Sequence, residues 1–362
     1  MLETKPSAGE FEASIFGPGV GECIVLHLGA GKWMVVDSCL SATTGGPVAL
    51  EYLGALGVDV QKDVVAVVVT HWHDDHTSGT SDVLRACDSA AFFCSAALGK
   101  REFFQLVAGA SQLQLKAKQG SGVDEMKLVF DVLKKRRSRS GGRTLTPDYA
   151  LANTIVFRSA SSEPPCVVEA LSPSSASVTR GMLSFAPKLL APKKRLPNPG
   201  PNELSMVLHV QFGEVAALLG ADLEVGSSDA VGWRAIVRNI RNPSGKATIV
   251  KVAHHGSLGA DHGAAWDALV LDNAHAAVTP FNSSRLPRPA DVERLRARTP
   301  HLFHASPRVG KAIKFDPTTE RTLQGIKIRE RRGTMGHIRF RVGTADVACE
   351  TFGAAHAFQG GG

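Results

Sequence analysis

The 362-residue sequence contains no long apolar stretch. Its longest uninterrupted aliphatic run, Val64–Val69, is far shorter than the ~20 residues that a membrane-spanning helix needs. Residues 1–14 are mixed polar and lack the apolar core of a signal peptide. We therefore expect a soluble, cytoplasmic protein with no membrane partner.

Paired cysteines are absent and aromatic residues are few. The six cysteines, at positions 23, 39, 87, 94, 166 and 349, include no Cys-x-x-Cys pair, so we expect reduced and mostly buried thiols. Aromatic residues make up 6% of the chain, which argues against a platform that stacks single-stranded bases. With 43% hydrophobic and 21% charged residues, the composition is nevertheless that of a globular protein with a buried core.

Basic residues outnumber acidic ones by 41 to 34, which gives a net charge of +7. The excess is concentrated in three segments: 134–143, 188–195 and 327–341. Such clusters are either solvated loop charge or a surface for a phosphate backbone, and the sequence leaves both readings open. The candidate nucleic-acid-binding residues are Lys134, Lys135, Arg136 and Arg137.

Short apolar strands with helices between them lie on both sides of a Ser-, Pro- and Gly-rich basic segment at about 100–203. The expected strands are 12–16, 22–28, 32–36, 63–69, 166–171, 206–212, 215–219, 247–252, 274–278, 312–315, 326–328, 338–342 and 347–351. The expected helices are 50–56, 81–87, 127–135 and 289–298. This order predicts an α/β protein, an αββα sandwich, in one domain (1–352) with an insertion at about 100–203 and a flexible tail at 353–362.

The most informative segment is THWHDDHTSG at 70–79, directly after the valine-rich strand. His71 and His73 are alternate residues at the strand's exit, so they point the same way and can bind one cation. Asp75 and His76 then face a second site close by. Histidine with a carboxylate suits zinc-type metals.

Two later segments place further candidate ligands at strand ends. In LLGADLE, Asp222 follows an apolar strand, where it could bridge two metals or serve as a helix cap or turn residue. In KVAHHGS, His254 and His255 lie together at another strand exit. A histidine pair alone is weak evidence, but it gains weight after the two preceding motifs.

In this order HWHDDH, GADLE and VAHHGS resemble the metallo-β-lactamase superfamily. They are most similar to its branch in the soluble hydrolase domain of competence (DNA-uptake) proteins. The opening hairpin that ends in Asp37, the segment Asn202–Ser205 and the segment Val278–Asn282 resemble the same branch. The likeness covers roughly 12–350, although 100–200 follows it poorly and the membrane segments of competence proteins are absent.

The resemblance implies a metallo-β-lactamase sandwich with two divalent ions, Zn²⁺ or Mn²⁺, as cofactors. The implied metal ligands are His71, His73, Asp75, His76, Asp222, His254 and His255. One residue of the pair His254 and His255 would complete the second site, and the other would hold the substrate's phosphate or act as an acid. The implied catalytic residues are thus Asp75, His254 and His255. Asp37 would orient a ligand histidine, or it is a turn residue.

One ligand that the resemblance leads us to expect is missing. Most of the superfamily supplies a third histidine to the first metal from a loop that corresponds here to VVEALSPSS at 167–175, which has none. The first site would then bind weakly, use a water, or recruit Ser172 or Glu169. His209 alternates within a strand, and we expect it in the core or in a cross-strand contact.

The resemblance implies a metal-dependent hydrolase, because two cations can activate water and polarise an ester. The basic segments favour a polyanion, so we expect a phosphodiesterase, and most of all a nuclease that cleaves DNA. Two alternatives stay open. One is a hydrolase of small esters, lactones or nucleotides, and the other is a non-catalytic binding module on the same scaffold.

Overall fold

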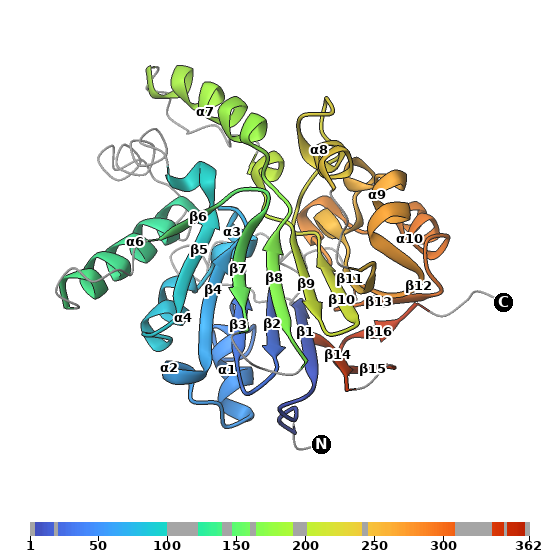
Figure 1. The fold of residues 1–362 in the computed structure, drawn as a ribbon, viewed down its shortest axis with the longest axis horizontal. Coiled ribbons are helices and arrows are strands. Elements are labelled where there is room, and N and C mark those ends of the chain that lie inside the picture. Colours follow the sequence, from blue (N-terminus) through green and yellow to red (C-terminus); the bar gives the residue numbers. More distant parts are fainter. Residues whose placement is uncertain are drawn as a thin grey trace, which may run out of the picture.

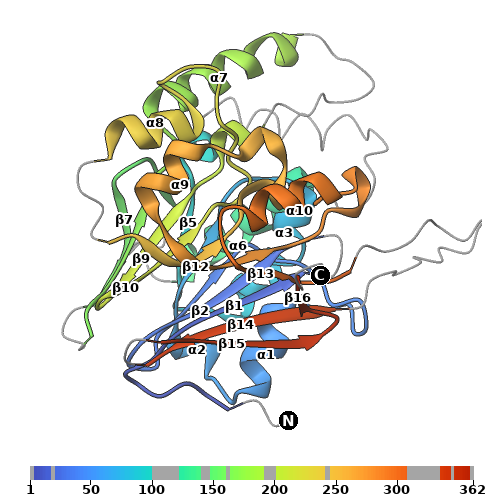
Figure 2. The same ribbon diagram turned by 90° about the vertical axis from the view of Figure 1, so that its right-hand side faces the viewer.

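The computed structural model describes residues 4–17, 21–99, 122–139, 147–159, 164–190, 201–240, 245–307, 335–343 and 346–358. Within these residues the strands form two eight-stranded sheets, and one hydrophobic cluster contains side chains from both. Helices cover the outer faces, as Figures 1 and 2 show. The predicted αββα sandwich is confirmed.

The first sheet contains most of the N-terminal half. In spatial order it consists of β15 (Val347–Gly353), β14 (Gly336–Val342), β1 (Phe11–Gly17), β2 (Cys23–Leu28), β3 (Trp33–Val36), β4 (Val64–Val69), β5 (Ala91–Ser95) and β6 (Asp148–Ala150). Its outer face packs against α1 (Val48–Ala55), α4 (Thr80–Ala86) and α6 (Gly122–Arg139), while α2 (Val60–Asp63) precedes β4.

The second sheet consists, in spatial order, of β16 (His356–Ala357), β13 (His301–His304), β12 (Val270–Val278), β11 (Ala247–Lys251), β10 (Val215–Leu219), β9 (Leu208–Phe212), β8 (Cys166–Ala170) and β7 (Thr154–Arg158). Its outer face packs against α8 (Gly232–Asn239), α9 (Gly263–Leu269) and α10 (Pro289–Arg296). These helices, in yellow and orange, lie on the far side of the strands from α4 and α6 in Figure 1.

Side chains of one strand alternate between the two layers that cover it. In β2, Cys23 and Val25 pack toward the helices, whereas Ile24 and Leu26 pack toward the second sheet. A strand covered on both faces has no polar side. This explains the continuous valine run of β4.

The direction of the strands brings the candidate site together. β3, β4 and β5 run parallel to one another, as do β10, β11 and β12. The carboxyl ends of parallel strands lie at the same edge of a sheet, where open α/β sheets bind their ligands. The segments after β4, β10 and β11 therefore meet at one edge of the sandwich.

The segment at 100–203 is, in its described parts, built into the fold rather than inserted into it. It supplies β6 to the first sheet and β7 and β8 to the second, together with α6 and α7 (Ser175–Leu190). Within the expected tail, β16 pairs with β13. The expected strands at 312–315 and 326–328 lie outside the described residues.

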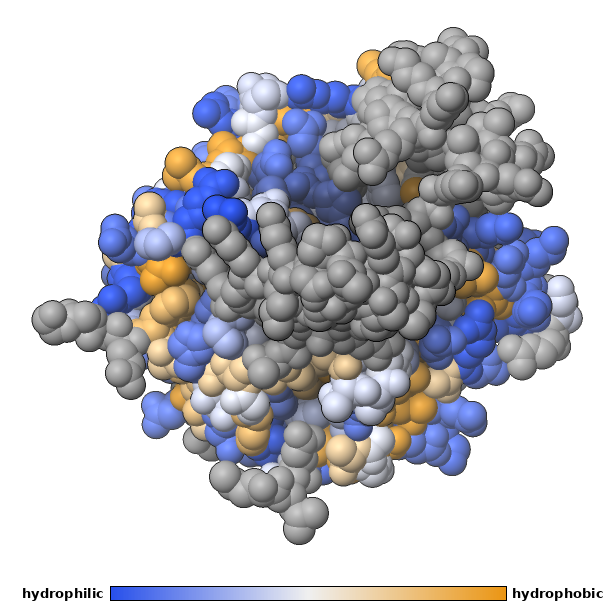
Figure 3. Space-filling model, turned by 180° about the vertical axis from the view of Figure 1, so that it is seen from behind, coloured by the Kyte–Doolittle hydropathy of each residue, from blue (hydrophilic) through white to orange (hydrophobic). Residues whose placement is uncertain are grey.

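The surface and the thiols agree with the composition. Across the described ranges, no helix is long and apolar enough to cross a membrane. All six cysteines are free, and only Cys349 is not fully buried. On the part of the face that Figure 3 leaves uncovered by grey, hydrophobic residues form small groups between hydrophilic ones.

Candidate metal centre

The ligand motif after β4 forms a tight turn into the short helix α3 (Asp74–Thr77). His76 N–H donates to the carbonyl of His73 at 3.0 Å, which closes the turn. His71 and His76 are fully buried, and the Asp75 side chain is only 10% exposed. The turn thus directs imidazole and carboxylate groups into the space between the sheets' edges.

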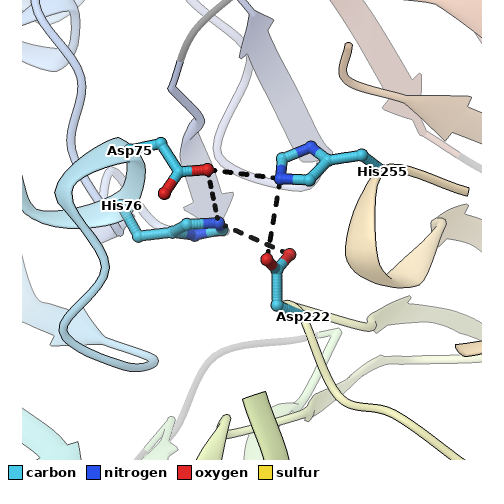
Figure 4. Close-up of side chains that lie close together, drawn as sticks. All are labelled: Asp75, His76, Asp222 and His255. Atoms are coloured by element: carbon cyan, nitrogen blue, oxygen red, sulfur yellow. Dashed lines mark ion pairs between the residues drawn. The ribbon is translucent and has the colours of Figure 1, made fainter. Parts of the chain in front are cut away.

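Three groups of side chains here each offer ligand atoms that lie within 4.8 Å of one another: Asp37, His71 and His76 form one, and two further groups share Asp222. We call the latter two subsite A, made of His71, His73 and Asp222, and subsite B, made of Asp75, His76, Asp222 and His255. Figure 4 shows the four side chains of subsite B pointing toward one another from three separate segments. Asp222 belongs to both subsites, which is the position predicted for a bridging carboxylate.

The atoms of subsite B fit a cation. His255 Nε2 lies 3.3 Å from Asp75 Oδ2 and 3.6 Å from Asp222 Oδ2, and His76 Nε2 lies 3.4 Å from Asp222 Oδ1. His76 Nε2, His255 Nε2 and Asp222 Oδ1 are buried and make no hydrogen bond. Buried polar atoms are nearly always paired. Converging nitrogen and carboxylate atoms of this kind are a suitable ligand set for a divalent metal.

Subsite A is the smaller group. His71 Nε2 lies 3.1 Å from His73 Nδ1 and 3.9 Å from Asp222 Oδ2. Neither Ser172 nor Glu169, the two proposed substitutes for the missing histidine, fits. The Ser172 hydroxyl is already engaged, because it donates to Ser205 O and accepts from Val207 N. Glu169 alternates with the inward-facing residues of β8, so it points out of the sandwich.

His209 is no candidate ligand either. It pairs with Glu169 across β8 and β9, and its Nε2 lies 3.0 Å from the Gly245 carbonyl oxygen. The cross-strand position expected for it is confirmed.

The loops that carry Asp222 and the histidine pair pack directly on each other. His254 N–H donates to Ala221 O at 2.8 Å. At Gly220, a Cβ atom would lie 2.8 Å from the Cβ of Ala253, so only glycine permits this approach. The close contact fixes Asp222 relative to the pair.

The structure separates the roles of the two adjacent histidines. His254 and His255 have φ values of 47° and 52°, and this left-handed turn sends their rings in different directions. His255 joins subsite B. His254 instead lies with Nε2 3.2 Å from Asn202 Nδ2 and Nδ1 3.5 Å from Glu224 Oε1, outside both ligand groups.

Burial and charge divide the histidines of the centre into two kinds. Burial, with His76 nearby, holds the pKa of His71 well below its ordinary value, and burial also lowers the pKa of His73. Burial acts in the same direction on His76, but Asp222, Asp75 and Asp37 more than offset it and raise its pKa well above the ordinary value.

The two central carboxylates respond to the same neighbours. Burial alone would raise their pKa values. For Asp75 this is outweighed by the nearby His76 and His255, and for Asp222 by His255, His76 and His71. The pKa of each therefore lies below its ordinary value, and both carboxylates are ionised at neutral pH.

Asp37 lies at the end of β3, beneath the centre. Its Oδ2 lies 2.7 Å from His76 Nδ1, so it orients this ring with Nε2 toward subsite B, as the sequence predicts. It also accepts the backbone N–H and the hydroxyl of Thr70, both at 2.7 Å. The Thr70 hydroxyl oxygen lies 3.0 Å from His71 Nδ1, so Asp37 supports both subsites.

The predicted nucleic-acid-binding set on α6 needs a correction. Arg136 is 2% exposed and donates to the backbone carbonyls of Leu84, Cys87 and Ala90. It ties α6 to α4 and cannot contact a polyanion. The other three residues are exposed, and they are Lys134, Lys135 and Arg137.

Comparison with known proteins gives a family match. The family model described as "Metallo-beta-lactamase superfamily" matches residues 16–132, which include the whole HWHDDH motif. The chain has the metallo-beta-lactamase fold. No curated protein matches it significantly.

Comparison with solved structures gives matches of low sequence identity and low TM-score. YhfI, a metallo-beta-lactamase fold protein from Bacillus subtilis, is 10% identical over 81% of this chain and 95% of its own, with a TM-score of 0.40. MEM-A1, a subclass B3 metallo-beta-lactamase from a soil metagenome library, is 14% identical over 74% of this chain and 88% of its own, with a TM-score of 0.37. CmlA, a diiron beta-hydroxylase from Streptomyces venezuelae, is 16% identical over 68% of this chain and 35% of its own, with a TM-score of 0.34.

Sequence reasoning missed several residues that surround the centre of this metallo-beta-lactamase fold. They are Glu22, Thr70, Glu224, Lys251 and Thr279. The signal for two of them was present, because Glu22 and Lys251 are charged residues beside or within otherwise apolar strands. Both are completely buried, which is rare for charged side chains unless they are paired.

Proposed function

We propose that the protein is a metal-dependent hydrolase of phosphodiesters, and specifically a nuclease that cleaves DNA. The observation that carries the proposal is the sharing of Asp222 between subsites A and B. Two divalent cations held close together supply an activated water and stabilise charge on the leaving oxygen. The resemblance to the competence branch supports DNA as the substrate. The choice of DNA stays a prediction.

The chain's own residues would divide this work. Asp75 and Asp222 would supply the negative charge that holds the cations, and Asp37 would keep His76 oriented as a ligand. His254 is 21% exposed in its side chain, at the rim of the centre beside Asn202. Its partial exposure supports a role for His254 in holding a substrate phosphate or acting as an acid.

The position of α6 supports a long, anionic substrate. Its first residue, Gly122, donates its N–H to Asp74 within the ligand turn, and α3 packs on α6. Lys134 comes twelve residues later, about 18 Å along the helix. The exposed residues Lys134, Lys135 and Arg137 would then contact phosphates several nucleotides from the cleavage point.

The test is cleavage of linear and circular, single- and double-stranded DNA and RNA. The protein is stripped of metal and resupplied with Zn²⁺, Mn²⁺ or Mg²⁺, with Asp75→Ala as the inactive control. Metal-dependent cleavage that the substitution abolishes supports the proposal. Turnover of a small phosphodiester or lactone reporter without nucleic-acid cleavage would favour the small-molecule hydrolase, and inactivity on both would favour a binding module.

A charge-reversal pair tests the contribution of α6. We expect Lys134→Glu/Lys135→Glu to weaken DNA binding and to make the logarithmic salt dependence shallower by roughly 2. The control Lys246→Glu/Arg296→Glu changes the net charge equally at exposed positions on the second-sheet side of the sandwich, before β11 and at the end of α10. Equal effects of the two pairs would contradict a specific role of α6.

A further inference from the structure

A buried ion pair lies directly behind subsite B. Lys251 Nζ is paired with Glu22 Oε2, and neither residue has any exposed surface. Glu22 stands immediately before β2 in the first sheet, and Lys251 ends β11 in the second. The pair therefore joins the two sheets at the edge where the ligands converge.

Both members of the pair also contact ligand-bearing segments through the backbone. Glu22 N–H donates to the carbonyl oxygen of Asp75 at 2.8 Å. Lys251 Nζ lies 3.4 Å from the carbonyl oxygen of Ala221, the residue before Asp222. Two of the loops that form subsite B thus rest on this pair.

A threonine connects the pair to the third ligand segment. The Thr279 hydroxyl donates to Glu22 Oε2 at 2.6 Å. His255 Nδ1 lies 3.1 Å from both the hydroxyl oxygen and the carbonyl oxygen of Thr279. Because the hydroxyl proton is committed to Glu22, both of these oxygens accept, and His255 must carry its proton on Nδ1. The lone pair of Nε2 then faces subsite B.

The same arrangement recurs on the other side of the centre. His71 Nδ1 lies against the Thr70 hydroxyl, which donates to Asp37. In both cases a ligand histidine, a threonine hydroxyl and a buried carboxylate follow one another.

We propose that Glu22, balanced by Lys251, is a positioning residue for subsite B and acts on His255 through the Thr279 hydroxyl. The inference rests on the proposed metal-binding function, but it concerns metal affinity and not the choice of substrate. Loss of an outer partner of a metal-ligating histidine costs roughly 10- to 100-fold in metal affinity. Lys251 pairs with this carboxylate, and an unpaired buried charge there would be strongly destabilising.

The decisive comparison is Thr279→Val against Thr279→Ser. Valine has nearly the shape of threonine but no hydroxyl, whereas serine keeps the hydroxyl. Titration calorimetry of the metal-free full chain with Co²⁺ should show one of two equivalents bound roughly 10- to 100-fold more weakly in Thr279→Val. Thr279→Ser should bind both as the wild type does.

A spectroscopic readout reports on His255 itself. In the Co²⁺-loaded protein, the Nδ1 proton of His255 should give a paramagnetically shifted NMR resonance. We expect this resonance unchanged in Thr279→Ser and displaced in Thr279→Val. Wild-type affinity and an unchanged resonance in Thr279→Val would overturn the proposal, whether or not the protein cleaves nucleic acid.

Glu22→Gln tests whether the negative charge of Glu22 contributes to the hydrogen-bonded path from Glu22 through Thr279 to His255. It should weaken the same equivalent, and the double variant Glu22→Gln/Thr279→Val should lose little more than either single variant, because both interrupt one path. Independent, additive losses would overturn a path from Glu22 to His255. A wild-type protein that binds no Co²⁺ would overturn both this proposal and the proposed function.

Discussion

Subsites A and B share Asp222 but differ in how completely the chain encloses them. Subsite B has four ligand side chains, and hydrogen bonds from buried carboxylate networks orient both of its histidines. Subsite A has three, and the loop expected to supply a further histidine is engaged elsewhere. We infer that subsite B is the tighter site and that subsite A exchanges its metal more readily.

One hairpin supports both subsites. Glu22 precedes β2 and Asp37 follows β3, so the two carboxylates lie at the same end of the antiparallel pair. Each reaches a ligand histidine through a threonine hydroxyl, His255 and His71 respectively. The asymmetry between the subsites thus comes from the number of ligands and from the direct contact of Asp37 with His76.

The largest effect should come from removing the shared ligand. Asp222→Ala should abolish tight binding at both subsites, a loss greater than the ~100-fold typical of an outer partner. Cleavage should be lost with it. Equilibrium dialysis with metal analysis measures the stoichiometry, and exposed Asp229→Ala is the matched control. Retention of one tightly bound ion would show that Asp222 is not common to both sites.

The next effect separates the subsites. His76→Gln should remove the tight ion, because His76 belongs only to subsite B among the two ligand groups. His73→Gln should remove the weaker ion and leave the tight one. The two variants serve as controls for each other in the same dialysis experiment. If His73→Gln removed the tighter ion, the ranking of the subsites would be reversed.

The fold could be predicted where burial of one or both faces of a strand or helix sets the pattern of apolar residues in its sequence. The valine run of β4 and the hairpin of β9 and β10 were expected because burial on both faces or a Gly turn marks them. The first half of β12 was not, because Leu271, Asp272 and Asn273 are all exposed and the last two are polar. A tertiary contact, the pairing of Val270 with Ala247 of β11, joins the start of this segment to the sheet.

The residue types of the candidate site could be predicted from the sequence, but the directions in which their side chains point could not. Spacing along the chain identified His254 and His255 together, but the left-handed φ of both residues decides which ring enters the centre. Arg136 shows the opposite limit. Its neighbours in sequence are exposed, and only the packing of α6 on α4 buries it.

A smaller effect should follow from weakening the direct support of His76. Asp37→Asn keeps an acceptor for Thr70 but removes the charge that helps to raise the pKa of His76. We expect subsite B to bind metal roughly 10- to 100-fold more weakly, with a lesser loss at subsite A. Calorimetry of the metal-free protein measures both. A greater loss at subsite A would mean that the path through Thr70 dominates.

A third series of a histidine, a hydroxyl and a buried carboxylate lies away from the metal centre. It shows how such a network behaves without a metal. His337 Nε2 lies 3.0 Å from the Ser14 hydroxyl, which donates to Glu12 at 2.8 Å. Burial, with Arg339 and Arg341 nearby, lowers the pKa of His337 to about 3. This ring therefore stays neutral in the folded protein at pH values where the unfolded chain protonates it.

His337→Phe should consequently leave metal affinity unchanged and alter only the acid stability. Between pH 6.5 and 3 the unfolded state of the wild type binds the extra proton, so this histidine lowers the free energy of unfolding as the pH falls, by at most about 1.4 kcal/mol per pH unit. Phenylalanine keeps the stacking with Phe16 and Phe352 but cannot titrate. Urea unfolding of the metal-free proteins at pH 7 to 4.5 should therefore show a shallower decline for the variant, and parallel curves would contradict the lowered pKa.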